Sequence, residues 1–401
     1  MRRIAFLAFL ATLLPETLDA QNRSIDFEQT KDWKEIVQKA KEQKKMVFVD
    51  CYTSWCGPCK MLARDVFTKD EVADYFNEHF ICAKFDMEKD SDGVMLRKQF
   101  EVKAFPTLVF VDPSTGDIVH RMVGGCSPER LIDGAKQASD PDNNLNALTA
   151  RYRAGERGLD ITSKYASALF AAYKRADAAT IATDYLRSIP MSEWNKPGNW
   201  ALISRYVDDP LSPVLQYVMA HRKEFYPTVG QKETDGKLGK SIAKSVEEIV
   251  GWKAKPGKKF DEERNKALKA YLEGLDFEAA SIGVESLNTS AYARQGDYQA
   301  MLEHMKKVMD ADTFSPEFTN KFFLMHIAQL SYCGDPALIQ QGLDWIDRQI
   351  PQATGLGKGN LYITKARLLA KKGDKDGAAR ARETGMQINR EAVRQKNKTS
   401  V

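Results

Sequence analysis

Three cysteines lie within nine residues in the stretch CYTSWCGPCK, residues 51–60. Cys56 and Cys59 flank Gly57 and Pro58 and form a C-x-x-C motif. Cysteines at this spacing exchange electrons with other thiols and disulfides, bind a metal, or close a small structural disulfide. Zinc would need two further ligands, and the chain has neither a second C-x-x-C motif nor paired histidines. The residues therefore favour redox exchange over a structural disulfide or half of a zinc site.

The segments on either side of the motif place Cys56 where a thiolate is stabilised. The run KMVFVDCY, residues 45–52, is β-branched and aromatic with one acid, Asp50, which predicts a buried strand. From Pro58 onward the composition favours a helix, so Cys56 lies at or just before a helix N-terminus. Unpaired N–H groups and the helix dipole favour a thiolate there, and the thiolate is the nucleophilic form of the sulfur.

The following segments alternate between helix and strand patterns. A helix is expected over 68–80, opened by a capping box of Thr68 and Glu71. Further elements are expected as a strand at 80–87, a helix at 93–100, strands at 107–112 and 118–124, and a helix that begins at Pro128 with Ser127 as its N-cap. Alternating elements that finish in a hairpin predict a mixed sheet covered by helices.

These motifs, in this order, resemble the thioredoxin superfamily over residues 24–140. The matching features are a buried acid at Asp50, Trp55, the CGPC motif, a lysine at Lys84 in AKFDM, a proline at Pro106 in FPT, and Gly124 in the loop that faces the substrate. The long helical stretch after Cys59 is similar to the C-terminal domain of the membrane thiol:disulfide interchange reductase and its secreted relatives. The expected fold is thus an α/β thioredoxin-like domain.

The resemblance implies a role for each cysteine of the motif. Cys56, as the better-exposed thiol, attacks a substrate disulfide, and Cys59 resolves the mixed disulfide. Asp50, near Lys84, helps to deprotonate Cys59; the alternative is an acid satisfied at the edge of the sheet. The Gly-Pro dipeptide resembles that of reducing family members, which favours a reductase or isomerase.

The resemblance also implies a substrate groove. Its residues are Trp55, Gly57, Pro58, Phe105, Pro106 and Gly124. The family has a cis bond before the proline at position 106, whereas an ordinary trans turn is the commoner state of X-Pro bonds. The implied site needs no cofactor or metal beyond the Cys56 and Cys59 dithiol.

The remaining cysteines have simpler interpretations. Cys51 and Cys82 occupy apolar strand runs and are expected to be small buried hydrophobic residues. Cys126 follows the Gly124 loop and is either inert or a third reactive thiol. Cys333 has no visible partner.

Residues 141–401 are expected to be helical. The polar stretch SDPDNNLN, residues 139–146, is the candidate linker. Beyond it a Gly-Asp turn recurs at Gly296, Gly334 and Gly373, at spacings of 38 and 39 residues, with Ala176 in place of glycine further upstream. Such a period predicts stacked helical hairpins similar to tetratricopeptide repeats, which either bind peptides or proteins or only pack against the first domain.

The N-terminus predicts export from the cytoplasm. Arg2 and Arg3 precede the apolar run IAFLAFLATLL, so residues 1–20 are expected to be a signal peptide cleaved after Ala20, leaving a periplasmic or secreted protein with no membrane span. A net charge of +4 with 28% charged residues argues against nucleic acid as the main partner.

Together these features predict a secreted thiol:disulfide oxidoreductase that acts on protein thiols and disulfides. The helical domain would hold or select the client, and a membrane thiol reductase would supply electrons, since a reductant in an oxidising compartment needs a source. The competing hypothesis is a non-catalytic helical scaffold or peptide-binding protein whose CGPC motif is a structural disulfide.

Overall fold

The computed structural model describes residues 23–251 and 259–398. This part of the chain forms two compact units, of which the first ends at Ile189 and the second begins at Pro190. The expected signal peptide, residues 1–20, lies outside the described residues. Every helix in the described ranges is too short or too polar to cross a bilayer.

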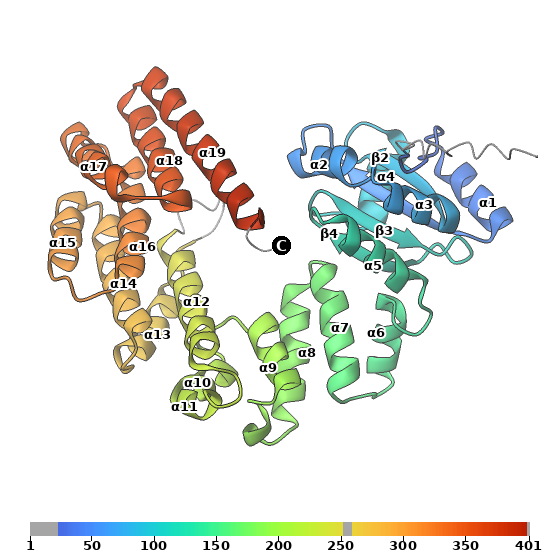
Figure 1. The fold of residues 1–401 in the computed structure, drawn as a ribbon, viewed down its shortest axis with the longest axis horizontal. Helices are drawn as coiled ribbons and strands as arrows, with labels where there is room; N and C mark the ends of the chain where they lie inside the picture. The colour runs from blue at the N-terminus through green and yellow to red at the C-terminus, as the bar shows by residue number, and fades with distance from the viewer. Residues whose placement is uncertain (1–22, 252–258, 399–401) are drawn as a thin grey trace, which may run out of the picture. The chain divides into compact units, whose positions relative to one another are not determined.

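The first unit contains a four-stranded mixed sheet in the order β2-β1-β3-β4. Figure 1 shows this sheet among the helices of the unit. Its strands are β1 (Met46–Tyr52), β2 (Phe80–Asp86), β3 (Thr107–Val111) and β4 (Ile118–Val123). Strand β1 is parallel to β2 and antiparallel to β3, and β3 and β4 form an antiparallel hairpin. This is the mixed sheet that the sequence predicts.

Five helices cover the two faces of this sheet. They are α1 (Trp33–Gln43), α2 (Gly57–Asp65), α3 (Asp70–His79), α4 (Ser91–Gln99) and α5 (Pro128–Ser139). On one face Val47 and Val49 pack with residues of α1 and α4. On the other face Phe48 packs with residues of α2, α3 and α5. Successive residues of a strand point to opposite faces, so β1 contributes to both cores.

Two details differ from the sequence-based expectation. Thr68 does not cap α3: Lys69 is the N-cap residue without a side-chain cap hydrogen bond, and the Thr68 hydroxyl donates to the carbonyl of Arg64 at 2.6 Å. The Thr68 hydroxyl therefore hydrogen-bonds to a carbonyl near the end of α2 rather than to an N–H group at the start of α3. Phe27, which no motif identified, forms a β-bridge with Cys82 at the outer strand of the sheet.

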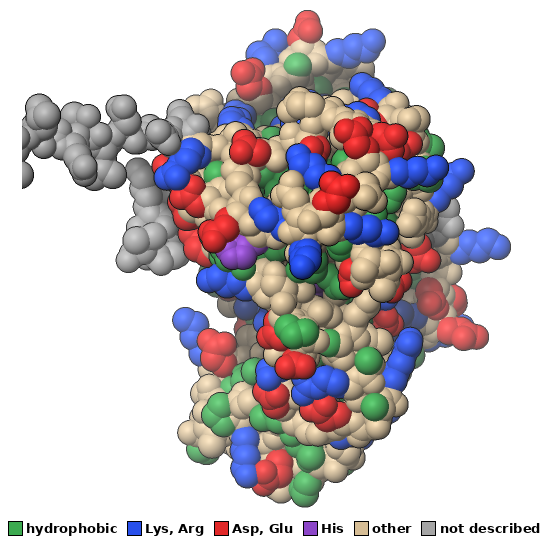
Figure 2. Space-filling view, turned by 90° about the vertical axis from the view of Figure 1, so that its right-hand side faces the viewer, with side chains coloured by type: hydrophobic (Ala, Val, Ile, Leu, Met, Phe, Trp, Pro, Cys, Tyr) green, Lys and Arg blue, Asp and Glu red, His purple; other side chains and the backbone are tan. Residues whose placement is uncertain are grey.

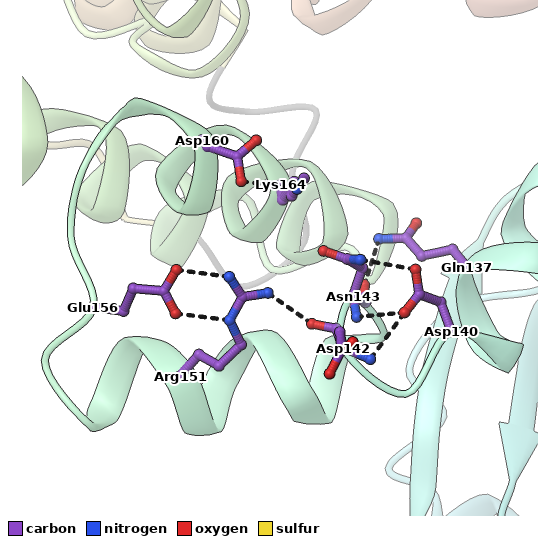
Figure 3. Close-up of polar contacts among 8 residues, drawn as sticks. All are labelled: Gln137, Asp140, Asp142, Asn143, Arg151, Glu156, Asp160 and Lys164. Carbon is purple, nitrogen blue, oxygen red and sulfur yellow. Dashed lines mark hydrogen bonds and ion pairs between the residues drawn. The ribbon is translucent and has the colours of Figure 1, made fainter.

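The polar stretch at 139–146 is an ordered junction between α5 and α6 (Leu145–Arg153) (Figure 3). The Asp140 carboxylate accepts from the backbone N–H groups of Asp142 and Asn143, and Asn144 caps α6. Helices α6 and α7 (Leu159–Ala171) then pack against β4, and α8 (Arg175–Arg187) pairs with α7. The compact unit that includes the sheet consequently continues past this junction.

The described part of the second unit is all helical, as expected. Its α-helices are α9 (Pro197–Tyr206), α10 (Pro213–Ala220), α11 (Arg222–Phe225), α12 (Gln231–Val250), α13 (Glu262–Glu273), α14 (Glu278–Gln295), α15 (Tyr298–Asp310), α16 (Pro316–Ile327), α17 (Pro336–Gln349), α18 (Gly355–Lys372) and α19 (Lys375–Lys398), with short 3-10 turns η1 (Met191–Glu193), η3 (Ala328–Tyr332) and η4 (Ile350–Gln352). Consecutive helices pack as pairs, for example α14 with α15 and α18 with α19.

The recurring Gly-Asp turns connect helices within this unit. Gly296 and Gly373 have positive φ angles of 82° and 96°, which glycine adopts without steric cost, and they end α14 and α18. The upstream turn is not at Ala176: the residue with a positive φ is Tyr173, and Ala176 lies inside α8. The hairpins are present, and their likeness to tetratricopeptide repeats stays a prediction.

Candidate active site

Cys56 and Cys59 form a disulfide at the N-terminus of α2. Cys56 is the N-cap residue, with φ −72° and ψ 109°, and the backbone N–H of Cys59 donates to Cys56 Sγ at 3.1 Å. Pro58 fits the first turn because its missing N–H would have no helical partner there. When the pair is reduced, the helix dipole and this N–H favour a thiolate on Cys56.

Exposure does not distinguish the two cysteines, contrary to the expectation that Cys56 is the more accessible. The exposed fractions are 2% for Cys56 and 4% for Cys59, because the neighbouring residues cover both sulfurs. Position in the helix does distinguish them, since Cys56 is the cap and Cys59 lies within the first turn. Helix geometry rather than exposure therefore favours Cys56 as the first nucleophile.

Asp50 lies on β1, on the face of the sheet that α2 covers. Its side chain points to the same face of the sheet as that of Phe48, two residues earlier in β1. Its paired residue on β2 is Lys84. Burial raises the pKa of Asp50 from 3.8 to about 7, and the positive charges of Lys84 and Lys31 oppose this shift. An acid with this pKa exchanges protons near neutral pH.

Lys31 was not identified from the sequence. It belongs to the segment before α1, and its Nζ donates to the backbone carbonyl of Lys84 at 2.5 Å and lies 3.7 Å from Asp90 Oδ2. No sequence pattern links residue 31 to the acid at position 50, because only the folded sheet places the N-terminal segment beside β2.

Three of the residues expected to line a substrate groove, Pro58, Pro106 and Gly124, belong to segments that contact one another. The Phe105–Pro106 peptide bond is cis, and the N–H of Gly124 donates to the Pro106 carbonyl at 2.9 Å. Gly124 has a φ of 92°, which favours glycine. A Cβ added to Gly125 would lie 4.0 Å from Cβ of Pro58, so the 124–126 loop and the CGPC motif are adjacent.

Trp55 and Phe105 form the aromatic rim of this site. Their rings meet edge to face with centroids 5.9 Å apart, and Trp55 is 66% exposed. The Trp55 indole N–H donates to Glu88 Oε2 at 2.8 Å, and Glu88 also pairs with Arg97 at 3.2 Å. Neither Glu88 nor Arg97 was identified from the sequence, because their association with Trp55 depends on the placement of α4.

The other cysteines are unsuited to attack. Cys51 and Cys82 are buried, as expected, and burial raises the pKa of each thiol. Cys126 is half-buried in the 124–126 loop, and burial raises its pKa to about 11, which favours the inert interpretation. Cys333 is buried in the second unit. Within the described residues, no three His, Cys, Asp or Glu side chains are grouped to bind a metal.

Comparisons with known proteins match the part of the chain that forms this site. Residues 26–113 match the model of a thioredoxin-like family. Thioredoxin H4 of Arabidopsis thaliana is 35% identical over 92 residues, or 23% of this chain and 71% of the relative. A protein disulfide-isomerase of Datisca glomerata is 28% identical over 138 residues, or 34% and 27% of the two chains. The solution structure of a proposed disulphide-isomerase from Bacteroides thetaiotaomicron shares 44% identity over 30% of this chain and 98% of that chain, with a TM-score of 0.28.

Proposed function

The chain belongs to the thioredoxin superfamily and is a thiol:disulfide oxidoreductase, and we propose that it reduces or isomerises disulfides of secreted proteins. The observation that carries the proposal is the Cys56–Cys59 pair at the N-terminus of α2, beside cis-Pro106 and the Gly124 loop. These residues place the redox pair at a helix N-terminus, next to the loop that holds Gly124 and Gly125.

The reaction starts from the reduced dithiol. The Cys56 thiolate attacks one sulfur of the client disulfide, forming a mixed disulfide, and the other client sulfur leaves with the electron pair and takes up a proton. Cys59 then attacks Cys56 and releases the second client thiol. The client gains two electrons and two protons, and the enzyme ends as the Cys56–Cys59 disulfide.

Asp50 is suited to take the proton from Cys59 in the second step. Burial raises its pKa to about 7, so a large fraction is deprotonated at neutral pH and the acid form is also accessible. Lys84 stabilises the carboxylate and keeps this pKa from rising further. Asp50 therefore supplies the base, and Lys84 adjusts its strength.

The helical unit is proposed to bind the client or a partner protein. Helices α9, α12, α14, α16 and α18 line a cavity of about 1410 Å³ within that unit. Its walls combine aromatic side chains, including Trp200, Phe277 and Phe318, with charged residues of both signs. Aromatic residues with polar groups among them are typical of protein interfaces and of ligand pockets.

Location and electron supply are part of the proposal. The signal-like N-terminal sequence supports a periplasmic or secreted protein, and an oxidising compartment requires a membrane thiol reductase to regenerate the dithiol. Acidic and basic side chains are interspersed on the face shown in Figure 2, which supports protein rather than nucleic acid as the partner.

Insulin reduction by the full chain tests the redox function. Cys56→Ser should lose activity because the nucleophile is missing, whereas Cys59→Ser should accumulate client mixed disulfides because the resolving thiol is missing. Cys126→Ser serves as the control and should keep activity, since its thiol is not part of the exchange. Unimpaired turnover by Cys56→Ser would refute the proposal.

The low exposure of both sulfurs favours one alternative, a helical scaffold with a structural disulfide. The reduction potential separates the two functions. A potential below about −300 mV, together with thiols that resist alkylation after reduction, would indicate a structural bond. A higher potential with a readily alkylated Cys56 supports the oxidoreductase.

A further inference from the structure

Four side chains at the rim of the redox site contact one another in a closed ring. Trp55 donates its indole N–H to Glu88 Oε2 at 2.8 Å, and Glu88 Oε1 lies 3.2 Å from Nη1 of Arg97. The guanidinium carbon of Arg97 lies 5.3 Å from the centroid of the Phe105 ring. The Phe105 ring meets Trp55 edge to face at 5.9 Å, which completes the ring of contacts.

The four residues come from separate segments of the redox fold. Trp55 directly precedes Cys56, and Phe105 directly precedes cis-Pro106, so both adjoin the redox centre. Glu88 follows β2, and Arg97 lies in the last turn of α4. Arg97 therefore connects α4 to both aromatic residues: it contacts Phe105 directly and reaches Trp55 through Glu88.

These contacts restrict an aromatic side chain that is otherwise largely free. Trp55 is 66% exposed, and a ring with so little packing samples several rotamers unless polar contacts hold it. The hydrogen bond that Trp55 donates to Glu88 fixes one edge of the indole, and Arg97 neutralises Glu88 while its guanidinium lies over the Phe105 ring. An apolar client residue thus meets two rings that are already oriented, which lowers the entropy lost on binding.

We propose that Arg97 is a positioning residue that gives the redox site a preference for clients with a large apolar side chain beside the reactive cysteine. Arg97 acts through Glu88 and Phe105 and has no part in the electron transfer. The inference rests on the proposed function, because it concerns how the same Cys56–Cys59 site selects its disulfide.

The test uses the reduced full-length protein and two disulfide-linked peptides that differ in one residue, Leu or Gly, beside the cysteine. The wild type should have the lower KM for the Leu peptide. Arg97→Ala should raise the KM for the Leu peptide by about threefold to tenfold, with kcat changed by less than about twofold, because binding loses its preorganisation. The KM for the Gly peptide should change much less.

Further variants separate positioning from folding. Arg97→Lys keeps a charge for Glu88 but lacks the guanidinium that lies over the Phe105 ring, so its KM should be intermediate. Glu88→Gln keeps an acceptor for Trp55 and weakens the link to Arg97, and its effect should not add to that of Arg97→Ala. Arg64→Ala removes an arginine that, among the described residues, pairs with its neighbour Asp65, and should leave the KM unchanged.

The outcomes are distinguishable. A wild type that reduces neither peptide contradicts the proposed function itself. The role of Arg97 is overturned if the wild type reduces both peptides and the KM of Arg97→Ala and Glu88→Gln is unchanged. It is also overturned if the KM of these variants rises equally for the two peptides. If Arg97→Ala fails to fold, the Leu-to-Gly ratio of KM in Arg97→Lys and Glu88→Gln decides the question.

Discussion

Asp50 and Lys84 lie at paired positions on neighbouring parallel strands, yet Asp50 Oδ1 accepts no hydrogen bond from any described residue. Lys84 instead extends its Nζ over the ring of Phe27 at 5.2 Å. Among the described residues, Lys84 thus offers Asp50 Oδ1 a positive charge but no hydrogen bond. Burial dominates as a result, and it raises the pKa of Asp50 to about 7.

This raised pKa predicts that Asp50 destabilises the folded redox unit at neutral and alkaline pH. The pKa is 3.8 without burial and about 7 in the fold, so the native state binds more protons between these values and stability falls as pH rises through this window. Asp50→Asn should therefore stabilise the oxidised protein by up to about 4 kcal/mol at pH 8 and by much less at pH 5. Urea unfolding at several pH values measures the difference.

Asp117→Asn is the matched control for this experiment. Asp117 is an exposed acid in the turn between β3 and β4, and its replacement should leave the pH dependence of the wild type intact. A stability difference between Asp50→Asn and wild type that is the same at pH 5 and pH 8 would show that Asp50 titrates like an exposed acid. The proposed proton transfer from Cys59 would then lose its base.

The two lysines near Asp50 should affect its titration in the same direction but unequally. Both lower the pKa of Asp50, and Lys84 has the larger effect. Lys84→Met should move the acidic limb of the pH profile for insulin reduction to higher pH, and Lys31→Met should move it less. An unchanged pH profile in Lys84→Met would show that Lys84 does not affect the protonation of Asp50. Lys89→Met, a lysine outside this group, is the control.

The strands and helices of the redox unit follow from local patterns in the sequence. The alternation of apolar residues and the Ser127-Pro128 helix start predict elements that the structure contains, because burial and capping act over a few residues. The capping box at Thr68 fails for a local reason too: α3 has Lys69 as its N-cap residue, and the Thr68 hydroxyl donates to the carbonyl of Arg64. A motif of this kind does not show at which residue the helix begins.

Residues that join the site through tertiary contacts were not predictable in this way. Lys31, Glu88 and Arg97 reach the site from a coil segment, the turn after β2 and a helix, and none has a fixed spacing from the CGPC motif. The near-equal burial of Cys56 and Cys59 is also a property of the packed fold. Sequence patterns identify the reacting atoms, whereas the side chains that orient them depend on where α4 and the N-terminal segment pack.

The cavity of the helical unit yields a prediction about client selection. Phe318 on α16 lines that cavity, whereas Phe314 lies just before the same helix and does not. Both side chains pack against the same hydrophobic core, so either replacement by alanine removes a similar amount of packing. In a Cys59→Ser background, Phe318→Ala should reduce the amount of client protein trapped as mixed disulfide, and Phe314→Ala should not.

Insulin reduction by the single variants should stay at the wild-type rate, because the redox centre is untouched. Equal trapping by the two variants would mean that the cavity does not hold the client and that the helical unit has another task.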